Sequence, residues 1–254
     1  MQAYLSVIIP MFNEEENLRR GVLTEVESYL KKQPYSWEVI ISDDESTDGS
    51  VAFVESFIKE HQHFALLKNK HGGKPFAVRA GIEQAVGEIV LFSDMDQSTP
   101  LDQIEKFFPY FEKGYLVVIG SRGQTRTGFS IFRQIASGVF RLIRQVLLLP
   151  HIADTQCGFK AFKNNIAKET FSGLQIFRVR KETKGWRVGA FDVELLFIAQ
   201  KRGYRIAEVP VVWRDKDIAT GKQRKFFKES LEMFKEILRV KLNDLRGYYN
   251  SSNK

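Results

Sequence analysis

Short apolar segments alternate with helical patterns through the first half of this chain, and this alternation restricts the possible folds more than any other feature. Helical spacing of apolar residues predicts helices from about residue 13 to 30, 51 to 60 and 76 to 86. Such alternation predicts βαβ units on a mostly parallel sheet, an α/β fold class. The strands are almost continuously apolar, as expected when helices cover both faces. The predicted strands cover 5–10, 37–42, 63–68, 88–94 and 115–120.

The second half of the chain has a looser pattern. We predict a helix over 131–149, a loop over 154–162, a helix over 191–203 and a strand over 206–213. A basic amphipathic helix is predicted over 225–245. We therefore expect one α/β domain over residues 1–222, followed by a helix and tail over 223–254.

Composition narrows the classes of protein. The 254 residues carry a formal charge of +7, which favours anionic partners such as nucleic acid, phosphorylated small molecules or a membrane surface. The single cysteine, Cys157, excludes an internal disulfide framework and a cysteine-based zinc site. We find neither an N-terminal signal nor about eighteen consecutive apolar residues, so we expect a protein without a transmembrane segment.

Acidic residues follow two of the predicted strands. Asp43 and Asp44 follow the strand at 37–42, whereas Asp94 ends the strand at 88–94 and Asp96 lies two residues further on. Ligands of open α/β sheets bind beyond the carboxyl ends of the strands. Aspartates also cap helices, but two carboxylates this close at a strand end repel each other unless a positive charge lies between them. Oxygen ligands alone suit Mg²⁺ or Mn²⁺, so we predict a divalent cation at Asp94 and Asp96.

Eight segments in order resemble those of the inverting family 2 glycosyltransferases of GT-A fold. Within that family they are most similar to the enzymes that transfer a sugar from a nucleotide donor to a polyprenyl phosphate, as dolichyl-phosphate glucose and mannose synthases do. Together they span about 215 residues. The segments are IIPMFNEEENL (8–18), ISDDESTDGS (41–50), GGKPFAVRAG (72–81), VLFSDMDQSTP (90–100), GSR (120–122), DTQCGFKAF (154–162), FDVELL (191–196) and VPVVW (209–213).

The resemblance implies a role for each matching residue. Asp94 and Asp96 hold the cation on the donor diphosphate. The mannosyl enzymes tend to carry glutamine where this chain has Ser98, which favours a glucose-type branch and a UDP-glucose donor. The usual Gly-Xaa-Ser-Lys loop is not preserved in ATGKQRKF (219–226). The implied donor-binding residues are Pro10, Asn13, Glu14, Asp43, Asp44, Lys74, Arg79, Asp94, Arg214, Lys222 and Arg224.

A one-sided run of basic residues lies between Glu112 and Asp154, where no acidic residue occurs. Arginines can hold a phosphate through two parallel hydrogen bonds, although a generic basic surface would give the same pattern. The resemblance implies that Arg122, Arg133 and Ser137 bind the phosphate of the lipid acceptor. The arginines of the run are Arg122, Arg126, Arg133, Arg141 and Arg144.

An anionic acceptor simplifies the chemistry. A hydroxyl acceptor needs a general base, whereas a phosphate monoester is already ionised and can attack without one. We predict Asp94, Asp96, Arg122, Arg133 and Asp154 as the catalytic set.

Two acids after the basic run have two possible roles. Asp192 and Glu194 are predicted to contact the donor sugar, and Asp192 could instead cap its helix. Asp154 is expected to contact that sugar or to order the arginines.

Two alternative functions remain at this point, and the last helix has two possible placements. A family 2 enzyme that glycosylates a glycan hydroxyl would need Asp154 or Asp192 as its base. A nucleic-acid-binding protein would interleave aromatic and basic residues in a recognisable module, which we do not find, so we predict no nucleic-acid partner.

The apolar stripe of the last helix either packs on the domain or lies on a bilayer. We favour the bilayer, and thus a peripheral enzyme on the cytoplasmic face of a membrane. The oligomeric state cannot be inferred. His71 and His151 lack metal-ligand spacing and are predicted to be ordinary surface residues.

Overall fold

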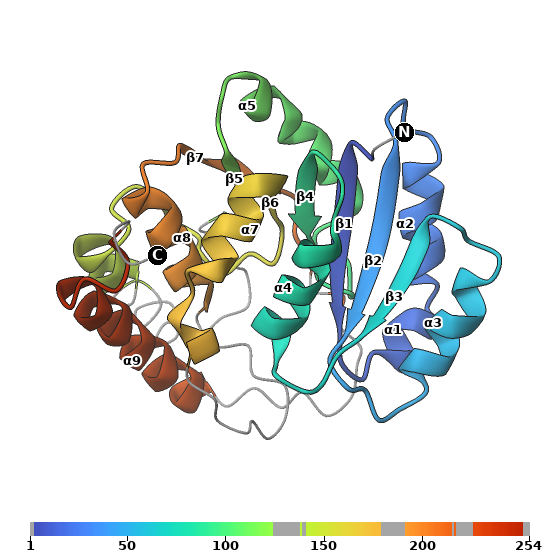
Figure 1. Cartoon of the computed structure of the whole chain (residues 1–254), viewed down its shortest axis with the longest axis horizontal. Coiled ribbons are helices and arrows are strands. Elements are labelled where there is room, and N and C mark those ends of the chain that lie inside the picture. Colours follow the sequence, from blue (N-terminus) through green and yellow to red (C-terminus); the bar gives the residue numbers. More distant parts are fainter. Residues whose placement is uncertain are drawn as a thin grey trace.

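A seven-stranded mixed sheet forms the centre of the described part of the chain (Figure 1). The computed structural model describes residues 3–123, 138, 141–178, 191–214, 216 and 226–250, with the side chains of the last helix from residue 233 onward. The strand order is β3-β2-β1-β4-β6-β5-β7. The strands are β1 (Leu5–Met11), β2 (Trp37–Asp43), β3 (Phe64–Lys68), β4 (Ile89–Phe92), β5 (Val117–Ser121), β6 (Lys160–Lys163) and β7 (Ile206–Pro210).

The predicted parallel sheet is confirmed for β1 to β4 and for the β5–β7 pair. One strand departs from the prediction. Strand β6 begins in the segment 154–162, for which the sequence predicts a loop, and it runs antiparallel between β4 and β5. Lys160 pairs with Phe92 in this register. The strand is only four residues long and begins with a lysine, so its alternation is too short to recognise.

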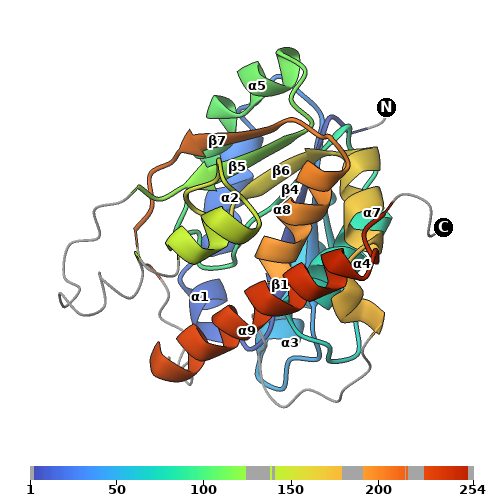
Figure 2. The same ribbon diagram turned by 90° about the vertical axis from the view of Figure 1, so that its left-hand side faces the viewer.

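Helices cover both faces of the sheet (Figures 1 and 2). One layer holds α1 (Glu15–Arg19), α2 (Val22–Leu30), α3 (Ser50–Ile58), α5 (Phe108–Glu112) and the 3₁₀ helix η1 (Leu101–Lys106). The other holds α4 (Lys74–Gln84), α7 (Asn164–Ser172), α8 (Phe191–Lys201) and α9 (Phe226–Leu245), and the 3₁₀ helix η2 (Gln175–Arg178) follows α7. Residues 141–147 are also helical, within the predicted 131–149 helix.

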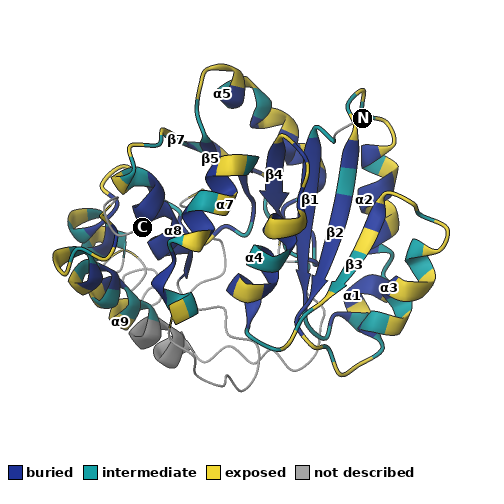
Figure 3. Ribbon diagram, in the orientation of Figure 1, coloured by how far each residue is buried: buried dark blue, intermediate teal, exposed yellow. Residues whose placement is uncertain are grey.

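The side chains on the two faces of the strands pack into two separate hydrophobic cores, one on each side of the sheet. Val7 and Ile9 of β1 pack with the α1–α3 layer, whereas Ile8 packs with the α4–α9 layer. Successive side chains of a strand point to opposite faces, so a strand between two helix layers must be apolar throughout. Figure 3 shows the resulting buried strands beneath a partly exposed helical shell.

The first predicted helix is divided in two. Gly21 adopts φ 92° and separates α1 from α2, a conformation that glycine reaches without steric cost. Asn13 is not the N-cap residue of α1: that residue is Glu14, whose side chain makes no capping hydrogen bond. Asn13 instead has φ 53° and turns the chain out of β1.

The last helix packs on the domain and also exposes apolar residues. Ile237 and Val240 of α9 are fully buried against the second core, with Tyr249 beyond the helix. The predicted stripe faces away from that contact. Its described members are 37–72% exposed: Phe234, Leu238, Leu242 and Leu245. The described part of segment 223–254 therefore shares a core with residues 1–222, while the stripe identified in the sequence lies on the surface.

Candidate active site

The two predicted metal acids lie in the turn that follows β4, at the edge where β1 and β2 also end. Asp94 forms an ion pair with Lys74, at the first turn of α4. Burial alone would lower the pKa of Lys74, but the nearby carboxylates of Asp94, Asp192 and Asp96 raise it above its ordinary value. The lysine is therefore held as a cation at this edge of the sheet.

Asp94 also touches the backbone of the 154–158 turn. A Cβ atom on Gly158 would lie 1.9 Å from Asp94 Oδ2 and 2.5 Å from its Cγ. Only glycine allows the carboxylate to lie in this position. The turn and the strand end are thus fitted to one another around the Asp94 side chain.

Asp96 is fixed by its neighbours in the turn. Its Oδ1 accepts a hydrogen bond from the Ser98 amide at 2.8 Å. Its carbonyl accepts one at 2.6 Å from Arg20, which also donates to the carbonyl of Lys216 at 2.5 Å. Arg20 therefore joins the metal turn to the chain beyond β7. Nothing in the sequence around Arg20 indicates this role.

Asp94 and Asp96 fit a hard divalent cation. Both offer oxygen ligands only, and the side chain of Asp94 is 40% exposed. Within the described ranges no cluster of three or more histidine, cysteine, aspartate or glutamate side chains could hold a metal ion. A cation here would take its remaining ligands from water or from substrate oxygens.

The loops after β1 and β2 hold each other through polar contacts. Asn13 Oδ1 accepts a hydrogen bond from the Thr47 amide at 2.8 Å, and the Asn13 amide donates to Ser46 Oγ at 2.9 Å. The Glu14 amide donates to Ser50 Oγ at 2.8 Å. Pro10 is buried in β1 beside Ser42 of β2. Four of the predicted donor-binding residues, Pro10, Asn13, Glu14 and Asp43, therefore lie at one edge.

Asp44 is completely buried, and its contacts shape the next turn. Its two carboxylate oxygens accept hydrogen bonds from the Gly72 and Gly73 amides, both at 2.8 Å. His71 Nδ1 lies 2.9 Å from Asp44 Oδ2, and the His71 side chain is only 18% exposed. Burial raises the pKa of Asp44, against the opposing effect of these three partners. The prediction that His71 is an ordinary surface residue is wrong, whereas His151 is exposed as expected.

Arg122 and Asp154 form a two-pronged ion pair. Arg122 donates from Nε and Nη2 to the two oxygens of Asp154, both at 2.8 Å. Burial alone would raise the pKa of Asp154, but Arg122 holds it well below its usual range. The structure thus places Asp154 where it orders the arginine, one of the two predicted roles. Both Nε and Nη2 of the guanidinium are therefore engaged by the carboxylate.

Arg144, one of the five arginines of the basic run, does not lie on the surface. It is 3% exposed and donates to Thr155 Oγ1 at 2.7 Å and to the carbonyls of Ile152 and Ala153. Burial lowers the pKa of Arg144 to about 10. The arginine therefore ties the 141–147 helix to the 152–155 segment.

Asp192 and Glu194 are two residues apart in α8 but lie in different environments. Asp192, in the first turn, accepts a hydrogen bond from Lys160 Nζ at 2.6 Å. Glu194 is fully buried and accepts hydrogen bonds from the Gln175 amide at 2.9 Å and from Tyr249 at 2.7 Å. Its other oxygen pairs with Arg239 of α9 at 3.0 Å. These contacts anchor α9. Among the described residues, no hydrogen bond or ion pair joins Glu194 to Asp94 or Asp96.

The remaining predicted residues divide into two groups. Arg79 pairs with Glu83, and its guanidinium lies 4.7 Å from the ring centre of Phe177. The Arg214 amide donates to the Ser98 carbonyl at 2.8 Å, so this exposed arginine lies beside the metal turn. The others lie outside the described residues: Arg126, Arg133, Ser137, Lys222 and Arg224.

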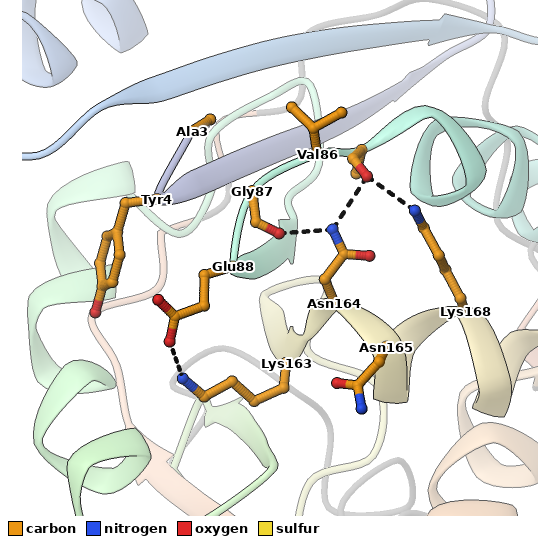
Figure 4. A pocket seen from close by; sticks show the side chains of 10 residues that line it. Ala3, Tyr4, Val86, Gly87, Glu88, Lys163, Asn164, Asn165 and Lys168 are labelled. Atoms are coloured by element: carbon orange, nitrogen blue, oxygen red, sulfur yellow. Dashed lines mark hydrogen bonds and ion pairs between the residues drawn. The ribbon is translucent and has the colours of Figure 1, made fainter. Parts of the chain in front are cut away.

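A surface depression of about 710 Å³ lies at the opposite edge of the sheet (Figure 4). It contains none of the residues predicted from the sequence. Its polar side chains bind one another or the backbone: Lys163 pairs with Glu88, and Asn164 donates to the carbonyls of Ala85 and Gly87. The size of this depression therefore does not make it the reaction site.

Comparison with known proteins agrees with the geometry. Residues 6–171 match the family described as "Glycosyl transferase family 2". Two dolichyl-phosphate beta-glucosyltransferases, from Dictyostelium discoideum and Homo sapiens, are 35% and 33% identical to the chain. The alignments cover 97% and 96% of this chain and 76% of each relative.

The chain belongs to glycosyl transferase family 2. The family prediction made from the eight sequence segments is confirmed, and the protein is a glycosyltransferase.

Solved structures of other glycosyltransferases have the same fold. A mannosyltransferase from Pyrobaculum calidifontis, bound to GDP-Man and Mn²⁺, has a TM-score of 0.60 at 19% identity, over 100% of this chain and 71% of its own. A glucosyl-3-phosphoglycerate synthase from Mycobacterium tuberculosis, bound to Mn²⁺, UDP-glucose and phosphoglyceric acid, has a TM-score of 0.62 at 18% identity, over 94% and 79%. The predicted GT-A fold is confirmed.

Proposed function

We propose that this glycosyltransferase transfers glucose from UDP-glucose to a polyprenyl phosphate such as dolichyl phosphate, with inversion at the anomeric carbon. Its relatives named as dolichyl-phosphate beta-glucosyltransferases support the substrate class. A phosphate oxygen of the lipid attacks the anomeric carbon, the bond to the donor diphosphate breaks, and UDP leaves.

The pairing of the carboxylates carries this proposal. Asp154 is bound by Arg122, Asp192 by Lys160, and Asp44 by two backbone amides. A hydroxyl acceptor would need one of the described acids at this edge as a base, and the pKa of Asp154 is held well below its usual range. An acceptor phosphate is already ionised and needs no proton removed. The paired acids therefore favour a phosphorylated acceptor.

The donor would lie across the ends of β1, β2 and β4. The nucleoside would meet the strand ends and loops that carry Pro10, Asn13, Glu14 and Asp43, while Asp44 shapes the turn that leads to Lys74. Lys74 places a positive charge beside the diphosphate position. Arg214 lies next to the metal turn, and we assign Lys222 and Arg224, which follow it in the sequence, to the same diphosphate. Arg79, which lies further along α4, would contribute to donor binding from there.

Asp94 and Asp96 would hold Mg²⁺ or Mn²⁺. A divalent cation bound there offsets the negative charge that develops on the leaving diphosphate. Arg122, oriented by Asp154, would meet the incoming phosphate together with Arg133 and Ser137. Lys74 and Arg122 then supply fixed positive charge on either side of the reacting atoms, so that two anions can approach each other.

A direct test compares acceptors that differ only in the phosphate. Purified protein with Mn²⁺ and labelled UDP-glucose would be given a short polyprenyl phosphate, the matching polyprenol, or an oligosaccharide. We expect glucosyl lipid only from the phosphate, with GDP-mannose as a poorer donor. Transfer to the polyprenol or the oligosaccharide would instead favour a hydroxyl-acceptor enzyme, and Asp192→Asn would then abolish it while Arg122→Met would not.

We further propose that the exposed stripe of α9 rests on an anionic membrane surface. Phe234, Leu238, Leu242 and Leu245 lie on one side of the helix, and Lys235 of the helix and Arg246, directly after its end, are exposed. Leu142 and Val146 of the 141–147 helix are 62% and 75% exposed. An amphipathic helix with a charged face opposite its apolar face binds at the bilayer interface, and the formal charge of +7 on the whole chain favours an anionic one. No helix in the described ranges is long and apolar enough to span a bilayer.

Charge placed in this stripe should release the protein from membranes. We expect Leu238→Glu with Leu242→Glu to lower the partition coefficient on anionic vesicles at least about 10-fold, because each leucine gains roughly 1–2 kcal/mol when it leaves water. Co-sedimentation with vesicles of phosphatidylcholine and phosphatidylserine measures this. Glu substitutions at Lys235 and Arg246 should weaken binding only at low salt. Unchanged co-sedimentation of the double leucine variant would contradict the proposal.

A further inference from the structure

Lys160 is a charged residue in a place where charge is costly. Its side chain is completely buried at the start of β6. The ammonium donates to Asp192 Oδ1 at 2.6 Å and to the Cys157 carbonyl at 2.5 Å, and lies 5.3 Å from the ring centre of Phe92. Phe92 in turn packs with Phe162, Phe171 and Phe191. Lys160 lies in the DTQCGFKAF segment, but the family resemblance implied no role for it.

Stability alone does not account for such a residue. Removing an ammonium and a carboxylate from water costs several kcal/mol per ion, and well-packed apolar residues of similar volume are often at least as stable. A methionine at position 160 would suit the surrounding phenylalanine rings. The retained ion pair therefore points to a role in the site beyond packing.

The partners of Lys160 lie on three parts of the active site. Lys160 pairs with Phe92, two residues before Asp94. The Cys157 carbonyl directly precedes Gly158, whose backbone contacts the Asp94 carboxylate. Asp192 lies in the first turn of α8. The Lys160 ammonium thus lies where three elements meet: β4, which leads to Asp94 and Asp96, the 154–158 turn, and the first turn of α8.

We propose that Lys160 is a positioning residue for the transfer reaction, which holds the Asp192 carboxylate in the orientation in which it contacts the donor sugar. This inference rests on the proposed function, and it adopts the contact with the donor sugar that the sequence predicts for Asp192. Asp192 is only 8% exposed, so its carboxylate is held mainly by the groups packed around it. The hydrogen bond to Lys160 fixes one oxygen and thereby directs the other.

A double-mutant cycle tests this coupling. We expect Lys160→Met and Asp192→Asn each to lower kcat about 10²-fold, the effect of a small misplacement of a positioned group. The kcat of the double variant should lie within about threefold of the lower of the two single-variant kcat values, since Lys160 acts through Asp192. The Kd of UDP with Mn²⁺, measured by calorimetry, should change less than about threefold. Independent losses would multiply to about 10⁴-fold, and this would overturn the inference, as would normal kcat in Lys160→Met.

Two additions keep the test decisive. If Lys160→Met does not fold, the double variant removes both charges. A kcat equal to that of Asp192→Asn then supports the inference, and a further loss of about tenfold contradicts it. Lys163→Met is the matched control, since Lys163 lies on the same strand but pairs with Glu88 at the opposite edge.

The same cycle is measured on the hydrolysis of UDP-glucose by water. Hydrolysis needs no lipid, so wild-type protein that hydrolyses the donor but fails to glucosylate polyprenyl phosphate refutes the proposed acceptor alone. Lack of coupling in hydrolysis refutes the role of Lys160.

Discussion

Replacing Asp94 and Asp96 together by asparagine is expected to lower kcat by roughly 10³-fold or more, because the donor diphosphate would lose the charge that stabilises its departure. The substitution keeps the size of both side chains, and the new amide oxygen at position 96 can still accept the hydrogen bond from the Ser98 amide. The buried Lys74 would lose two of the three carboxylates that hold it as a cation, so we also expect a lower thermal unfolding temperature. Mn²⁺-dependent binding of UDP, measured by calorimetry, should be lost together with glucosyl transfer.

Asp102→Asn is the control for this pair. Asp102 lies at the start of η1, beyond the metal turn, and its exposed side chain contacts Gln103. The control variant should keep full activity and full affinity for UDP with Mn²⁺. Turnover by the double variant in metal-free buffer at the wild-type rate would refute the metal site.

Gly158→Ala should be nearly as harmful, for a steric reason. The new Cβ would lie 1.9 Å from Asp94 Oδ2, and the nearest neighbours it would meet all belong to the Asp94 carboxyl group. The carboxylate or the turn must therefore move. We expect a loss of about 10²-fold in kcat and about 1–3 kcal/mol in the free energy of unfolding.

A second substitution separates the two consequences. Asp94→Ala combined with Gly158→Ala removes the group that clashes, so the unfolding temperature should return toward that of Asp94→Ala while activity stays lost. Gly173→Ala is the control, since its Cβ would approach only the flexible end of Arg202 at 3.0 Å, the Thr170 carbonyl at 3.4 Å and Ile198 at 3.5 Å. A Gly158→Ala enzyme with normal kcat would show that Asp94 need not occupy its observed position.

The acidic strand ends could be predicted from the sequence because they depend on local order. Asp43 and Asp94 closely follow apolar runs, and parallel strands bring their carboxyl ends to one edge. The eight segments then sufficed to assign the family. Local order also predicted the apolar stripe of α9. The stripe is exposed because Ile237 and Val240, on another side of the helix, pack against the domain instead.

Predictions failed where a residue's partner is distant in the chain or where the chain folds back on itself. Arg144 fits the pattern of a basic surface, yet it folds back onto the carbonyls of Ile152 and Ala153. His71 has no ligand spacing, but the end of β2 brings Asp44 against it. Burial and pairing of this kind depend on contacts between elements, which no periodicity encodes.

The sequence by itself therefore determined the layered sheet, the acidic edge and the family, because apolar periodicity and short motifs are properties of neighbouring residues. Only the tertiary structure decided which charges are paired. The antiparallel insertion of β6 placed Lys160 beside Asp192, and the approach of the 154–158 turn placed Asp154 on Arg122 and Gly158 against Asp94. The physical reason is that an ion pair depends on distance in space, and a buried charge is stable only where the fold supplies its counter-charge.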